Sequence, residues 1–210
     1  MSIILCIIQA RMGSTRLPGK VLMQIGGKAI LQWVIEAAEK ARLVDRVIVA
    51  TTAERKDDVI GDRYEAFRYG GNPSDVLGRF YHTALHYSPT HIVRLTSDCP
   101  ASDPEIIDAV IRHHLRGNYD YTTNSGFPGS YPDGQDVEVF TMGALTRAAK
   151  LATQDYDREH VTPFMKNSDM FKVGKLYCAN PTGKKLSVDT REDYERIKEE
   201  LECSLNRRSS

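Results

Sequence analysis

Residues 9–20, Gln-Ala-Arg-Met-Gly-Ser-Thr-Arg-Leu-Pro-Gly-Lys, decide how this chain folds and where it binds a ligand. They follow an apolar run at residues 3–8, which is typical of a buried parallel strand. Three cations stand among the glycines of this segment, namely Arg11, Arg16 and Lys20. Backbone amides beside glycine can point at an anion, and Ser14 and Thr15 add hydroxyl donors. We therefore predict that residues 9–20, called the cationic loop below, bind a polyphosphate.

The cationic loop differs from two common phosphate-binding motifs. A Walker A loop has four residues between its glycines, whereas five separate Gly13 from Gly19. Val21 follows Lys20, so the hydroxyl that binds magnesium in a P-loop is missing. The dinucleotide fingerprint with three spaced glycines is absent too. A loop that is basic by chance is the alternative, but its place after a strand favours ligand binding.

Strand and helix patterns alternate along the chain. We expect strands at residues 3–9, 46–51, 91–95, 120–123, 137–140, 171–176 and 186–188. We expect helices at residues 29–41, 75–86, 104–116, 142–151, 161–166 and 192–201. The alternation predicts an α/β fold with three layers, a Rossmann-like, mainly parallel (mixed) sheet between helices on both faces. Residues 125–135 are expected to form a long loop.

Size and composition narrow the classes of function. The 210 residues suit a single domain, expected at 1–202, with a flexible C-terminal tail at 203–210. Formal net charge is zero, which argues against a nucleic-acid partner. No apolar run approaches the ~20 residues of a membrane span, and no signal peptide is evident. The four cysteines are scattered, so we expect reduced thiols, no membrane and a cytoplasmic location.

Residues 7–22 resemble the signature loop of the cytidylyltransferases that activate acidic sugars, closest to the spore coat polysaccharide biosynthesis branch. Other segments agree with this family, namely residues 49–52, 74–77, 93–100, 131–134, 158–163 and 187–190. The resemblance spans about residues 3–200. It implies a fold of the nucleotide-diphospho-sugar transferase type, CTP and an acidic sugar acceptor as substrates, Mg²⁺ as cofactor, and a homodimer.

Transfer of a nucleotidyl group depends on positioning and charge neutralisation rather than on a nucleophilic side chain. We therefore expect Arg11, Lys20 and Asp98 to be catalytic. The expected nucleotide-binding residues are Ala10, Arg11, Gly13, Ser14, Arg16, Lys20, Ser74, Arg79 and Arg94. Capping of a helix is an equal explanation for Ser74, and a salt bridge within the fold is an equal explanation for Arg94.

Two aspartates are expected to hold the metal. Asp98 directly follows an expected strand, which delivers it to the sheet edge beside the cationic loop, and the resemblance implies that it is the metal-binding aspartate of the family. Asp103, in contrast, is expected to cap the next helix. Thr190 and Asp193 resemble a capping box, which leaves Asp189 just outside the last helix. The resemblance implies that Asp189 joins Asp98 on Mg²⁺; stabilisation of the helix start is the alternative.

The expected acceptor-binding residues are Gln135, Asp136, Glu138 and His160. The first three lie at or just after the glycine-rich loop and could bind sugar hydroxyls. His160 belongs to a segment that lies near the acceptor in the family the chain resembles. It could orient or deprotonate the attacking hydroxyl, or it could be a structural histidine.

These features together predict a Mg²⁺-dependent cytidylyltransferase that transfers CMP from CTP to the hydroxyl of an acidic sugar. Pyrophosphate is released, and the product feeds a surface or spore coat polysaccharide. Three alternatives are a nucleotidyltransferase acting on a sugar 1-phosphate, a glycosyltransferase using a nucleotide-sugar, and a non-catalytic nucleotide sensor. The preference for CTP depends on the resemblance alone, and the sequence does not name the acceptor sugar.

Overall fold

The computed structural model describes residues 2–209. Within them, a seven-stranded sheet has the order β5-β4-β1-β6-β8-β7-β9. Four neighbouring strands are parallel, namely β5 (Ala66–Tyr69), β4 (Arg46–Thr52), β1 (Ile4–Gln9) and β6 (His91–Thr96). β8 (Glu138–Thr141) runs antiparallel to β6 and β7 (Tyr121–Thr123), and β9 (Val173–Lys175) is parallel to β7.

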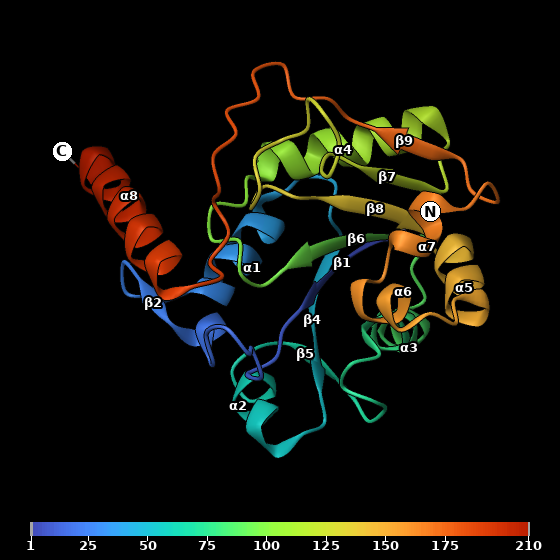
Figure 1. Ribbon diagram of the computed structural model, residues 1–210, viewed down its shortest axis with the longest axis horizontal. Helices are drawn as coiled ribbons and strands as arrows, with labels where there is room; N and C mark the ends of the chain where they lie inside the picture. The colour runs from blue at the N-terminus through green and yellow to red at the C-terminus, as the bar shows by residue number, and fades with distance from the viewer. Residues whose placement is uncertain (1, 210) are drawn as a thin grey trace.

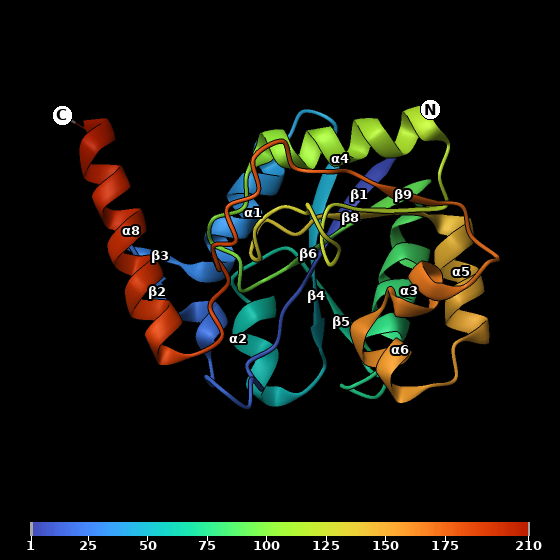
Figure 2. The same ribbon diagram turned by 45° about the horizontal axis from the view of Figure 1, so that its top comes forward.

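Helices cover both faces of the sheet (Figures 1 and 2). α1 (Ile30–Lys40) and α4 (Pro104–Gly117) pack on one face, and α3 (Val76–Tyr87) and α5 (Met142–Leu151) on the other. The apolar residues of β1 pack against the helices on both faces, because successive side chains of a strand point to opposite faces of the sheet. Cys6 and Ile8 pack with α1 and α4, whereas Leu5 and Ile7 pack with α3 and α5. The predicted three-layer α/β fold is confirmed.

A smaller unit lies at the edge of the molecule. β2 (Gln24–Ile25) and β3 (Lys28–Ala29) form a separate antiparallel ribbon. α8 (Arg191–Ser209) packs Tyr194 and Ile197 against Ile25 of this ribbon. Figure 1 shows α8 in red beside the ribbon, apart from the main sheet. The short elements are the 3-10 turns η1 (Lys20–Leu22) and η2 (Arg55–Asp57) and the helices α2 (Asp58–Gly61), α6 (Asp155–His160) and α7 (Pro163–Asn167).

Two expected elements differ in the structure. Residues 186–188 do not form a strand; Lys185 makes one isolated bridge to Asp133, and the amide of Val188 donates to the carbonyl of Asp98 at 2.8 Å. The last helix does not end at residue 201 but continues to Ser209. It runs through the expected domain boundary because residues 202–209 hold no glycine or proline that would end it. Ser210, the last residue of the expected tail, lies outside the described residues.

The order of the strands places the ligand site. β4 and β5 extend the sheet on one side of β1, whereas β6 lies on its other side. The chain therefore continues from β1 toward one side of the sheet and from β6 toward the other. Open α/β sheets bind ligands at such a switch point, beside the carboxyl ends of the two strands. No helix among residues 2–209 has the length and apolar character needed to cross a bilayer.

Candidate active site

A polar cleft of about 380 Å³ opens where β1 and β6 end. Most of the expected nucleotide-binding residues line it, namely Ala10, Arg11, Gly13, Ser14, Arg16, Lys20, Arg79 and Arg94. Ser74 does not; it is exposed, and its amide donates to the side chain of Asn72 at 2.9 Å. Asp75, the next residue, caps α3 by accepting from the amide of Gly78. The capping explanation for this segment is therefore confirmed, through Asp75 instead of Ser74.

The cationic loop is held in place by a buried carboxylate. Asp57 accepts a hydrogen bond from the amide of Met12 at 2.7 Å and another from the hydroxyl of Thr52. Met12 in turn accepts from the amides of Ser14 and Gly19, both at 3.0 Å. The loop is thus folded around the backbone of Met12. Sequence reasoning missed Asp57, because nothing local distinguishes it from its partly exposed neighbour.

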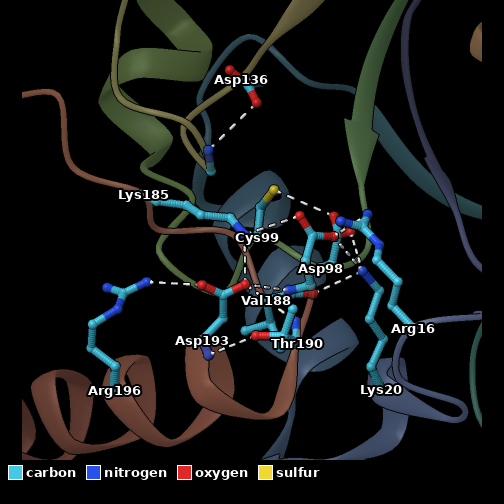
Figure 3. A network of polar contacts seen from close by, with 12 residues as sticks. Arg16, Lys20, Asp98, Cys99, Asp136, Lys185, Val188, Thr190, Asp193 and Arg196 are labelled. Carbon is cyan, nitrogen blue, oxygen red and sulfur yellow. Dashed lines mark hydrogen bonds and ion pairs between the residues drawn. The ribbon is translucent and has the colours of Figure 1, made fainter.

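Lys20 lines the cleft, and its ammonium points toward Asp98 (Figure 3). Its side chain is largely buried, and its ammonium donates to Oδ2 of Asp98 at 2.6 Å, to Oδ1 of Asp189 at 3.1 Å and to the carbonyl of Val188 at 2.7 Å. All three protons of the ammonium therefore have an acceptor. Asp98 comes from the end of β6 and Asp189 from the segment before α8, so one cation brings the two expected metal ligands together.

Asp189 also receives cations from two other segments. Arg16 of the cationic loop lies 2.8 Å from its Oδ1, and Lys185 lies 3.2 Å from its Oδ2. Burial by itself would raise the pKa of Asp189, but the hydrogen bonds from Lys20 and Lys185 lower it below its ordinary value. Asp189 is therefore ionised at neutral pH. The role of Lys185 was not predicted, because it lies in a segment without a motif.

The start of α8 explains the neighbouring polar residues. Thr190 and Asp193 exchange hydrogen bonds between side chain and amide, both at 3.2 Å, as the predicted capping box requires. Lys185 donates to Asp193 at 2.5 Å, and the contacts together lower the pKa of Asp193 to about 2 against the opposing effect of burial. Asp103 likewise caps α4, as expected. Asp98 and Asp189 have no such capping role.

These two carboxylates fit a divalent cation. Both reach one positive centre, and Mg²⁺ in nucleotide sites takes one or two carboxylates together with phosphate oxygens and water. Across residues 2–209, no group of three or more His, Cys, Asp or Glu is arranged to hold a metal. The phosphates of a nucleotide would therefore supply other ligands. Cys99 is adjacent, but burial raises the pKa of its thiol well above the ordinary value, so it offers no thiolate.

Arg79 is a second buried cation of the cleft. It is 1% exposed, and its guanidinium donates to the carbonyls of Pro73 at 2.7 Å and Ala50 at 3.5 Å. Within the described chain its Nε has no hydrogen-bond partner. Burial and, second, the charge of Arg11 lower its pKa to about 10, so it stays charged at neutral pH. Two arginines that line one cleft, Arg11 and Arg79, favour an anionic ligand.

A second cavity of about 300 Å³ adjoins the cleft, and Arg94 and His160 line both. Glu138, also in its wall, is 8% exposed and accepts hydrogen bonds from Arg94, Tyr121 and Thr162. Its carboxylate is thus occupied by the protein itself. Arg94 therefore makes the internal salt bridge and also faces the cleft.

The other expected acceptor-binding residues lie differently. Asp136 lines the second cavity, whereas Gln135 lines neither cavity. The amide of Gln135 donates to Pro132 at 3.0 Å, and its carbonyl accepts from Asn124 at 2.9 Å. Gln135 therefore shapes the loop before β8.

His160 ends α6 at a strained turn. Val161 has φ 72° and ψ −54°, and the amide of Thr162 donates to the carbonyl of His160 at 2.8 Å, which makes a γ-turn of the rare, strained kind. The preceding helix is fixed by Arg158, which contacts both carboxylate oxygens of Asp75 at 2.9 and 2.7 Å. This turn places His160 between the two cavities.

Known proteins share this sequence and this fold. A model of the cytidylyltransferase family matches residues 5–207. The spore coat polysaccharide biosynthesis protein SpsF of Bacillus subtilis is 34% identical over 212 residues, which cover 94% of this chain and 86% of that protein. A cytidylyltransferase structure from Leptospira borgpetersenii has a TM-score of 0.87 at 33% identity, over 94% of this chain and 86% of that one. A CMP:2-keto-3-deoxy-manno-octonic acid synthetase complexed with CTP has the same fold, with a TM-score of 0.73 at 18% identity over 97% of this chain and 100% of that one. As the cationic loop led us to expect, the chain belongs to the cytidylyltransferase family.

Proposed function

We propose that the protein transfers CMP from CTP to the hydroxyl of an acidic sugar and releases pyrophosphate, for synthesis of a surface or spore coat polysaccharide. The observation that carries this proposal is that Lys20 contacts both Asp98 and Asp189 at a cleft lined with arginines. Membership of the family supports the nucleotidyl transfer. The octulosonate synthetase with CTP bound supports CTP and a sugar acid as the two substrates, and the name of SpsF supports a polysaccharide as the destination.

The cleft suits the charges of this reaction. The acceptor oxygen attacks the α-phosphorus of CTP, and the bond from that phosphorus to pyrophosphate breaks. Arg11, Arg16 and Arg79 would neutralise phosphate oxygens. Bound by Asp98 and Asp189, Mg²⁺ would supply further positive charge at the phosphates.

Lys20 would act on the leaving pyrophosphate, where negative charge grows late in the reaction. In the structure its ammonium protons are bound to Asp98, Asp189 and the backbone. Lys20 must therefore exchange at least one of these acceptors for a phosphate oxygen when CTP binds. When the ammonium of Lys20 releases Asp98 and Asp189 in this way, the two carboxylates are free to hold Mg²⁺.

The experiment is pyrophosphate release with Mg²⁺, each of the four NTPs, and a panel of nonulosonic and octulosonic acids. Asp98→Asn is run beside Asp103→Asn, a matched control in the same loop that caps α4. We expect release with CTP and one acid, and a loss of at least ~100-fold in Asp98→Asn. Asp103→Asn should keep its activity, since Asn is itself a good N-cap residue.

The alternatives give different results. Release from a sugar 1-phosphate with another NTP would replace the acidic sugar as acceptor. Binding of CTP in a thermal-shift assay without any release would refute transfer to these acids and leave a nucleotide-binding protein. No binding of any NTP would refute the nucleotidyltransferase. The homodimer and the cytoplasmic location stay predictions, of which light scattering tests the first.

A further inference from the structure

The second cavity contains the carboxylate of Asp136. Its hydrogen-bond partners are the amide of Gly134, at 3.4 Å, and the hydroxyl of Ser125. Among residues 2–209 no lysine, arginine or histidine forms an ion pair with it, although Arg94 and Lys166 line the same cavity. A half-buried acid with open acceptor capacity is suited to a hydroxyl of a ligand.

Asp136 lies close to the centre of the proposed chemistry. The second cavity opens beside the cleft, because the two share Arg94 and His160. The carboxylate of Asp136 is near enough to Cys99 to help raise the pKa of its thiol, and Sγ of Cys99 lies 3.6 Å from Oδ1 of Asp98. In Figure 3, Cys99 lies between Asp136 and Asp98. An acceptor in the second cavity could therefore contact Asp136 and would lie next to the cleft that holds the phosphates in the proposed reaction.

Neighbouring groups are less suited to accept a proton there. The carboxylate of Glu138 is occupied by Arg94, Tyr121 and Thr162. Asp133 is exposed and lines neither cavity. His160 is exposed at the end of α6, where its ring packs against Tyr156 with a centroid distance of 4.5 Å. Of these three acids, Asp136 is the one that combines a cavity position with open acceptor capacity.

We propose that Asp136 is the general base of the transfer. Its carboxylate takes the proton of the acceptor hydroxyl while that oxygen forms a bond to the α-phosphorus and the bond to pyrophosphate breaks. The proton passes from Asp136 to water after the products leave. This proposal rests on the proposed cytidylyl transfer.

The surroundings tune the carboxyl for this task. Burial raises the pKa of Asp136 to about 6, and the charges of Asp133 and Glu138 act in the same direction. A base whose pKa lies near the working pH accepts a proton most effectively in catalysis. The charged and titratable groups that face this cavity or act on Asp136 are Asp133, Glu138, Cys99, Arg94, Tyr156, His160 and Lys166.

The test is the pH dependence of turnover between about pH 5 and pH 9. It uses Mg²⁺, CTP and the acid that gives release with the wild type, and it compares Asp136→Asn and Asp136→Glu with Asp133→Asn as the matched control. We expect Asp136→Asn to lower kcat by roughly 10²–10⁴-fold and to lose the fall in rate below about pH 6. Its affinity for CTP by calorimetry should stay within about twofold of the wild type. Asp136→Glu should restore part of the rate and the acid limb. Asp133→Asn should keep the rate at neutral pH and should keep an acid limb, which moves to lower pH because loss of the Asp133 charge lowers the pKa of Asp136.

The possible results separate the role of Asp136 from the proposed transfer. A wild type that turns over beside an equally active Asp136→Asn would overturn the role of Asp136 and leave the transfer standing. The same holds if His160→Asn, and not Asp136→Asn, removes the acid limb. An Asp136→Asn variant that loses activity but keeps the acid limb would reduce Asp136 to a structural residue. A wild type without release for any acid would refute the proposed transfer itself, and the general base with it.

Discussion

The ammonium nitrogen of Lys20 lies 2.6 Å from a carboxylate oxygen of Asp98 and 3.1 Å from one of Asp189. A single lysine thus separates two acids that would otherwise repel each other. Removal of one partner from a buried ion pair leaves a charge without compensation, which costs about 3–5 kcal/mol. The carboxylates here keep some contact with water, so the lower end of this range applies.

Lys20→Met is therefore expected to destabilise the fold by roughly 3 kcal/mol and to lower Tm by about 6–12 °C. Mg²⁺ should raise Tm of this variant more than that of the wild type, because the two freed carboxylates can then share the metal. Thermal unfolding with and without MgCl₂ measures both effects. Lys40→Met is the control, since that exposed lysine lies 3.9 Å from Glu36, near the limit of an ion pair. Equal responses to Mg²⁺ in all three proteins would contradict a shared metal site.

Asp57 and Asp58 provide a matched pair for the cationic loop. Asp57 is buried against Met12 and Thr52, whereas Asp58 forms a partly exposed ion pair with Arg68. Asp57→Ala should cost about 3 kcal/mol, because hydrogen bonds to a charged group contribute roughly 1.5–3 kcal/mol each. It should also weaken CTP binding about tenfold, since a loosened loop must be ordered again on binding. Asp58→Ala should change stability by no more than about 1 kcal/mol.

Urea unfolding and calorimetric titration of CTP measure the two effects. A loop that is held by CTP contacts alone, and not by Asp57, would show the same affinity in both variants.

The parallel half of the sheet could be predicted from sequence because β1, β4 and β6 each contain buried apolar residues that a sheet covered on both faces accommodates. β5 was missed, since Ala-Phe-Arg-Tyr at an edge position mixes polar and apolar residues. The strand expected at residues 186–188 was wrong for a related reason. Val188 is buried, but against Ile25 and Ile30 beside α8, so its apolar character came from packing and not from pairing.

Some contacts of the site could likewise be predicted from sequence, and others could not. Lys20 and Asp98 could be brought together from sequence, because both follow parallel strands that end at one edge of the sheet. Contacts between loops could not be predicted: the salt bridge of Lys185 with Asp189 and the hold of Asp57 on Met12 leave no periodic signal. Glu138 shows the limit most clearly. Its type suited a sugar ligand, but three neighbouring side chains occupy its carboxylate.

The lowered pKa of Asp193 predicts how the free energy of unfolding depends on pH. Its pKa falls from an ordinary 3.8 to about 2 in the fold, so it contributes stability above about pH 4 that is lost as the pH falls toward 2. Asp193→Asn should therefore be less stable than the wild type at neutral pH, and the difference should shrink in acid. Urea midpoints at pH 7, 4 and 3 measure this. Glu195→Gln, which removes only an exposed pair with Arg191, should run parallel to the wild type. An Asp193→Asn deficit that persists undiminished at pH 3 would contradict the linkage.

The backbone strain at Val161 predicts that glycine is more stable than alanine at this position, which reverses the usual order. A valine at positive φ carries roughly 1–3 kcal/mol of backbone strain, which Val161→Ala keeps and Val161→Gly relieves. Both variants lose the buried side chain, so Val161→Gly should be more stable than Val161→Ala by about 1 kcal/mol in urea unfolding. At Val110, equally buried inside α4, the order should be the usual one, with glycine about 1 kcal/mol less stable than alanine.

The relieved turn should also hold His160 less firmly between the two cavities, so Val161→Gly should raise KM for the acceptor while CTP affinity is unchanged. The same order at both positions would show that the turn at Val161 stores no strain.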